Sequence, residues 1–148
     1  MTNPTAAMLV IGDEILSGRT QDSNTFYLAG QLTAHGINLK EVRVVSDDAS
    51  AIIDSVRDLS NNYTHVFTCG GIGPTHDDIT SDSIAKAFDT NIDIREDARS
   101  ILQQHYDAQN LPLNDARLRM ARIPNKATLI DNPVSKAPGF TLKNVHVM

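Results

Sequence analysis

The stretch Tyr63-Thr64-His65-Val66-Phe67-Thr68-Cys69-Gly70-Gly71-Ile72-Gly73-Pro74-Thr75-His76-Asp77-Asp78-Ile79-Thr80 decides the fold of this chain. Its first part, residues 63–69, is rich in β-branched and aromatic residues, a composition that favours a strand. A glycine-rich segment follows at once, and residues 81–88 have the pattern of a helix. This succession is typical of one strand–helix unit in an α/β protein.

Two similar units precede this one. Residues 6–11 form a short apolar run ending at Gly12, which predicts a strand buried on both faces. Asp22-Ser23-Asn24 then offers capping side chains for a helix that closes at His35-Gly36. Residues 37–45 predict a second strand, and a helix over 49–59 follows the cap Ser46-Asp47-Asp48. Three units in succession predict a mostly parallel, doubly wound sheet.

The second half of the chain has weaker patterns. We expect a helix over 96–109, a short helix over 115–121 capped at Asn114, and strands at 128–130 and 145–147 that flank a loop over 132–140. Repeats and linker-like tracts are absent from the sequence, so we expect one domain over residues 1–148. The sequence stops at Met148 inside an apolar run, and a fragment truncated at its C-terminus is one interpretation.

Composition excludes several classes of function. A length of 148 residues with 41% hydrophobic content is enough for a single core. Net charge is −5 and the cations are dispersed, which argues against a nucleic-acid footprint. Apolar runs fall short of the roughly 20 residues that cross a bilayer, so we expect no membrane partner. A basic, apolar leader is also missing, and the single cysteine, Cys69, suits a reducing compartment, so we expect a cytoplasmic protein.

Ligands of parallel sheets bind outside the carboxyl ends of the strands, where this sequence carries three polar segments: Gly12 to Gly18, Ser46-Asp47-Asp48, and Gly70 to Thr80. Glycines let a backbone approach a phosphate closely, and a helix start points N–H groups at it. Acids beside that cradle would repel a bare pyrophosphate unless a divalent cation lies between them. An ordinary turn with capping acids is the alternative, but it needs only one or two of these residues.

The segments Gly12-Asp13-Glu14-Ile15-Leu16-Ser17-Gly18, Asp22-Ser23-Asn24 and Gly70 to Thr80 resemble the signatures of the molybdopterin-binding (MoaB/Mog-like) domain of CinA-type competence/damage-inducible proteins. The resemblance covers nearly the whole chain and implies a three-layer α/β/α fold. It also implies a homo-oligomer, a phosphorylated pterin or nucleotide as ligand, and divalent-metal-dependent pyrophosphatase activity on ADP-ribose or FAD. These 148 residues leave no room for the C-terminal deamidase domain of full-length CinA proteins, so we do not expect deamidase activity of them.

Residue roles follow from this resemblance. Asp47 and Asp78 match the two functional aspartates of the molybdopterin adenylyltransferases, whereas Asp77 stands where those enzymes have arginine, which favours hydrolysis. The late loop keeps the family's Asn132 and its Ala-Pro-Gly-Phe but has Ser135-Lys136 in place of Gly-Thr. We therefore expect catalysis by Asp47 and Asp78, and Mg²⁺ or Co²⁺ on Asp47, Asp77 and Asp78. The expected ligand contacts are Gly12, Asp13, Glu14, Ser17, Gly18, Gly70, Gly71, Gly73, Pro74, Thr75, Thr80, Asn132, Lys136 and Gly139.

Two alternatives stay open. One is adenylyl transfer to molybdopterin in molybdenum cofactor biosynthesis, and the other is a non-catalytic pterin or nucleotide binding module. Lys136 is either a phosphate-binding cation or a solvated surface lysine.

Overall fold

The structure is a computed structural model that describes residues 2–148. Its main sheet has six strands in the order β2-β1-β3-β8-β7-β6. Strands β1 (Thr5–Ile11), β2 (Asn38–Val45), β3 (His65–Cys69) and β8 (Val145–Val147) pair in parallel. Strands β7 (Gly139–Leu142) and β6 (Thr128–Ile130) complete the sheet as an antiparallel edge.

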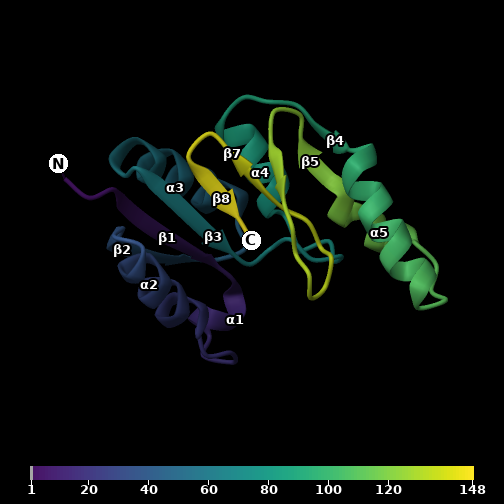
Figure 1. Cartoon of the computed structure of the whole chain (residues 1–148), viewed down its shortest axis with the longest axis horizontal. Coiled ribbons are helices and arrows are strands. Elements are labelled where there is room, and N and C mark those ends of the chain that lie inside the picture. The colour runs from purple at the N-terminus through teal and green to yellow at the C-terminus, as the bar shows by residue number, and fades with distance from the viewer. Residues whose placement is uncertain (1) are drawn as a thin grey trace.

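Helices cover both faces of this sheet. Helix α2 (Asn24–Ala34) lies on one side of β1, and α3 (Ala49–Asn62) and α4 (Thr80–Ala87) lie on the other (Figure 1). Alternate residues of β1 divide between the two faces, and Ala7, Leu9 and Ile11 join the core under α3 and α4. The prediction of a three-layer, mostly parallel, doubly wound sheet is confirmed.

Local capping chemistry starts the helices where the sequence predicts. The Asp48 carboxylate accepts the Ala51 N–H at 2.9 Å, and the Asn114 side chain accepts the Arg117 N–H at 2.9 Å. Asp22 is the acceptor at the start of α2, where its carboxylate receives the N–H groups of Asn24 and Thr25 at 3.1 and 3.3 Å. These contacts explain why the predicted helix starts agree closely with the observed ones.

The elements predicted from the sequence differ from those of the structure mainly in the short ones. The structure adds α1 (Asp13–Leu16), β4 (Ile92–Ile94), β5 (Arg122–Pro124) and β7, the last of which takes up the end of the predicted 132–140 loop. Helices α5 (Glu96–Ala108) and α6 (Asp115–Leu118), with the 3₁₀ turn η1 (Arg119–Ala121), agree with expectation. Strands β4 and β5 pair only with each other, and Asp93 and Arg122 interrupt any apolar run that would predict them.

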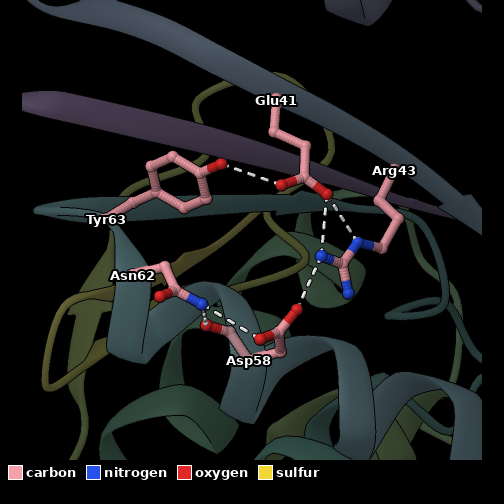
Figure 2. A network of polar contacts seen from close by, with 5 residues as sticks. All are labelled: Glu41, Arg43, Asp58, Asn62 and Tyr63. Atoms are coloured by element: carbon pink, nitrogen blue, oxygen red, sulfur yellow. Dashed lines mark hydrogen bonds and ion pairs between the residues drawn. The ribbon is translucent and has the colours of Figure 1, made fainter.

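A polar network fastens α3 to the edge strand β2 (Figure 2). The Arg43 guanidinium donates to Glu41 on its own strand at 2.8 Å and to Asp58 on α3 at 2.7 Å. The Tyr63 hydroxyl donates to Glu41 at 2.8 Å, and the Asn62 amide donates to the Asp58 carboxylate at 3.0 Å. These hydrogen bonds, first from Tyr63 and then from Arg43, lower the pKa of Glu41.

Within residues 2–148, each helix is too short or too polar to span a bilayer.

Candidate functional site

The carboxyl ends of β1 and β2 are joined by two acids. The Asp13 N–H donates to the Asp47 carboxylate at 3.1 Å, and the Asp47 N–H donates to the Asp13 carboxylate at 3.2 Å. The Gly12 N–H donates to the Val45 carbonyl at 3.0 Å just before them. Two segments separated by more than thirty residues are thereby held together, and both carboxylates lie at the edge of the sheet where a ligand is expected.

The glycine turn after β3 lies against the end of β1. Gly70 has φ +99° and Gly71 has φ +74°, values that a side chain disfavours. A Cβ on Gly70 would also lie 2.0 Å from the Ile11 carbonyl oxygen. Thr80, predicted as a ligand contact, is fully buried: its hydroxyl donates to the Gly70 carbonyl at 2.9 Å and its N–H to the Gly71 carbonyl at 3.1 Å. The structure therefore places Thr80 beneath the loop, where it holds the turn in shape.

Asp78 shapes the outer part of the same loop. Its Oδ2 accepts the Thr75 N–H at 2.9 Å and the Thr75 hydroxyl at 2.8 Å. A Cβ on Gly73 would come within 2.8 Å of that oxygen, so the backbone at this position lies directly against the carboxylate. Pro74 and Thr75 are exposed. The loop thus presents backbone and hydroxyl groups to solvent over an ordered carboxylate.

Asp47 contacts Asp13 and lies near enough to Glu14 and Asp78 for their charges to affect its pKa. Burial raises its pKa, and the neighbouring carboxylates of Asp13, Glu14 and Asp78 raise the pKa further, although the hydrogen bond from the Asp13 backbone opposes them. The ends of β1 and β2 and the Gly70 loop therefore bring negative charges together from three parts of the chain. Asp47 and Asp78, predicted from sequence as a pair, lie in this group, and Asp13 and Glu14 join them.

Asp77 does not join this group. Its side chain is 75% exposed and lies 3.3 Å from the His76 ring, which is itself 89% exposed. Successive residues of the turn point in different directions, so Asp78 faces the loop and Asp77 faces solvent. Across residues 2–148, the structure assembles no set of three or more His, Cys, Asp or Glu side chains arranged to hold a metal ion. The expected three-aspartate ligand set is therefore not formed in this structure.

The remaining predicted contacts, apart from Lys136, lie in two further places. Ser17 and Gly18 are exposed after α1, and the Ser17 hydroxyl donates to the Glu14 carbonyl at 3.3 Å. Asn132 and Gly139 line a cavity of about 280 Å³ that extends to Met148. The Asn132 amide donates to Ser135 Oγ at 2.8 Å and orders its own loop.

Lys136 points elsewhere. It adopts a left-handed backbone conformation at φ +64° and lines a separate cavity with residues of α5. The Lys136 N–H donates to the Asn132 carbonyl at 3.1 Å, but Lys136 lines a different cavity from the one that Asn132 and Gly139 line. Its assignment as a phosphate contact stays a prediction.

A cavity that sequence reasoning missed adjoins the acids. It measures about 330 Å³ and lies between α2 and the ends of β1 and β3. Of the three predicted capping residues Asp22-Ser23-Asn24, Asp22 accepts the backbone N–H groups at the start of α2, and Asn24 lines this cavity together with Cys69. The only local signal for this cavity is Tyr27, an aromatic residue on the first turn of α2, whose residues are mostly exposed. The lining side chains are Met8, Asn24, Tyr27, Leu28, Cys69 and Met148.

Taken together, these features define an α/β domain with a ligand site at the carboxyl edge of a parallel sheet, made of a glycine-rich loop beside a group of acids. The family model described as "Probable molybdopterin binding domain" matches residues 7–148. The chain belongs to this molybdopterin-binding domain family.

Individual relatives support the assignment. A protein from Metallosphaera sedula is 39% identical over 139 residues, which is 93% of this chain and 52% of the relative. A protein from Pyrobaculum arsenaticum is 34% identical over 135 residues, or 91% of this chain and 51% of the relative. The chain thus spans about half the length of these curated relatives.

Solved structures agree with the CinA-type assignment. "The protein CinA with unknown function" from Thermoplasma acidophilum superimposes with a TM-score of 0.90 at 34% identity, over 99% of this chain and 88% of that one. The tungsten cofactor synthesizing protein MoaB from Pyrococcus furiosus has a TM-score of 0.60 at 18% identity, over 100% and 82% of the two chains. This second likeness shows a shared fold.

Proposed function

We propose that this molybdopterin-binding-type domain is a divalent-metal-dependent pyrophosphatase that cleaves a nucleotide such as ADP-ribose or FAD. The observation that carries the proposal is the group of acids around Asp47: the Asp13 and Asp47 carboxylates each accept the other residue's backbone N–H, and burial, followed by the charges of Asp13, Glu14 and Asp78, raises the pKa of Asp47. Carboxylates gathered at a phosphate-type loop leave a negative field that a cation between protein and ligand would relieve.

The donor set fits such a cation without a complete protein cage. Mg²⁺ is usually held by one or two carboxylates together with substrate phosphates, so Asp47 and Asp78 are sufficient protein ligands. Because Asp78 Oδ2 already accepts two hydrogen bonds from Thr75, its Oδ1 is the oxygen left to face the ligand. A bound Mg²⁺ or Co²⁺ would neutralise charge on the phosphate oxygens and acidify a water molecule. Asp77 has no part in this arrangement.

The chain's own residues then orient the reaction. Backbone N–H groups of residues 70–73 would hold the phosphates, and Thr80 would keep the loop in shape through Gly70 and Gly71. The Asp47 carboxylate would accept a proton from the attacking water, which a bound cation would make more acidic. Water adds to one phosphorus, the bridging P–O bond breaks, and ADP-ribose yields AMP and ribose 5-phosphate.

Release of AMP tests the proposal directly. The purified chain is incubated with ADP-ribose or FAD and either Mg²⁺ or Co²⁺, and the products are separated by chromatography. We expect AMP only when metal is present. Asp47→Asn should lower the rate by about 100-fold or more, since removal of a general base costs that much. Asp54→Asn is the matched control, because it removes one exposed carboxylate from α3 and leaves the site intact.

Each other outcome points to a different function. Folded protein that releases no AMP with either metal overturns the proposal. An adenylated product from ATP and molybdopterin would identify an adenylyltransferase instead. Ligand binding that survives Asp78→Asn, without turnover by the parent chain, would identify a binding module. Assembly into a homo-oligomer and placement in the cytoplasm are part of the proposal and are tested by sedimentation and by cell fractionation.

A further inference from the structure

The cavity under α2 is a consequence of how that helix packs. Among the residues of α2, Leu32 alone is buried, so the first turns of the helix stand away from the sheet. Met8 and Val10 of β1 lie below this part of the helix and are 1% and 2% exposed. Tyr27, which is 69% exposed, stands at the rim. The result is an apolar floor with an aromatic side chain beside it.

This cavity continues into the acidic site. A second, more polar cavity of about 180 Å³ is lined by Glu14 and Asp22, among others, and shares Asn24, Cys69 and Gly70 with the first. Gly70 is the first residue of the glycine-rich loop, and Glu14 is one of the acids around Asp47. A ligand whose phosphates lie at the loop would therefore have the apolar cavity within reach of its remaining part.

We propose that this cavity, formed by Met8, Asn24, Tyr27 and Leu28, binds the flat heteroaromatic ring of the phosphorylated ligand. The inference rests on the proposed function, since ring and phosphates belong to one molecule. A volume of about 330 Å³ accommodates a bicyclic ring. An apolar floor and an aromatic wall suit the faces of such a ring, and the Asn24 amide offers one donor and one acceptor to its polar edge.

Equilibrium binding separates the ring from the phosphates. Three probes share a diphosphate or its methylene analogue: methylenediphosphonate has no ring, α,β-methylene-ADP carries a purine, and 6-hydroxymethylpterin diphosphate carries a pterin. Each is titrated calorimetrically into the 148-residue chain with Mg²⁺ present. We expect at least one ring-bearing probe to bind about 10-fold or more tighter than methylenediphosphonate. The ring, purine or pterin, that increases the affinity more identifies the ligand class.

Variants locate the ring. Tyr27→Ala should weaken the preferred ring-bearing probe by roughly 5- to 100-fold, the usual effect of losing a stacking partner, without changing the affinity for methylenediphosphonate. Tyr27→Phe should retain the tight binding. Phe26→Ala is the matched control, because Phe26 is the adjacent aromatic residue, is 88% exposed and lies outside the cavity.

Three results would overturn the inference. Ring-bearing probes that bind no tighter than methylenediphosphonate exclude a ring site, even if the chain releases AMP from ADP-ribose. Equal losses for all probes in Tyr27→Ala indicate a structural role for this side chain. A similar loss in Phe26→Ala places the ring elsewhere. Failure of every probe to bind in the presence of Mg²⁺ overturns both the ring site and the proposed function.

Discussion

Replacing Gly70 by alanine should destabilise the domain more than the same replacement at any other glycine in a turn. Two costs add at this position. The φ of +99° is unfavourable for a residue with a Cβ, at about 1–2 kcal/mol. The new Cβ would also lie 2.0 Å from the Ile11 carbonyl oxygen, which is backbone and cannot rotate away. Overpacking of this kind costs about 1–3 kcal/mol.

The sum, roughly 2–5 kcal/mol, is a large part of the stability of an ordinary domain. For a chain of this length it corresponds to a fall in Tm of roughly 5–15 °C. Thermal unfolding followed by circular dichroism measures the shift. We also expect weaker binding of methylenediphosphonate with Mg²⁺, since the loop has to move away from the end of β1.

Two other glycines separate the contributions. Gly36 has φ +75° but no atom within 4 Å of an added Cβ, so Gly36→Ala should show only the dihedral cost of about 1–2 kcal/mol. Gly30 is in the interior of α2 with open space around it, so Gly30→Ala should raise the stability by about 1 kcal/mol. If Gly70→Ala melts within about 2 °C of Gly36→Ala, the close approach to β1 has no energetic consequence and the reasoning is wrong.

Three further predictions concern charge. Asp47→Asn should raise the Tm in EDTA at neutral pH, because a carboxylate whose pKa is raised on folding destabilises the fold above that pKa. The variant should also lose most of the rise in Tm, roughly 5–10 °C, that saturating Mg²⁺ gives the parent. A lower Tm in EDTA would contradict the first expectation, and an undiminished rise with Mg²⁺ would contradict the second. Burial, with a smaller effect from His65, lowers the pKa of His146, so the unfolded chain takes up more protons and stability should fall as pH drops below 6.5. Urea unfolding at pH 5.5 and 7.5 should show a smaller difference for His146→Gln, and equal differences would exclude this histidine as the cause. Arg43→Met should lower the Tm by no more than about 3 °C, since partly exposed ion pairs contribute little, and a much larger fall would mean that the network in Figure 2 is essential to the packing of α3.

Local chemistry explains why so much of this architecture is predictable. The apolar run of β1 is buried on both faces, and Asp22, Asp48 and Asn114 each accept a backbone N–H at a helix start. These interactions involve neighbours in the chain, so composition and spacing record them. The place of Asp47 after β2 likewise follows from the strand order, because parallel strands end at one edge of the sheet.

Only the tertiary structure decides what non-neighbouring residues do. Asp77 and Asp78 are adjacent in sequence, yet Asp78 faces Thr75 inside the loop and Asp77 faces solvent. Asp13 enters the acidic group through its contact with Asp47, which depends on how β1 and β2 pair. Strands β4 and β5 gain their hydrogen bonds from each other although they lie far apart in the chain, and the cavity at Tyr27 exists because Leu32 is the one buried residue of α2. The glycine-rich loop and its acids were thus encoded locally, whereas the choice among those acids, and the space beside them, came from packing between segments far apart in the chain.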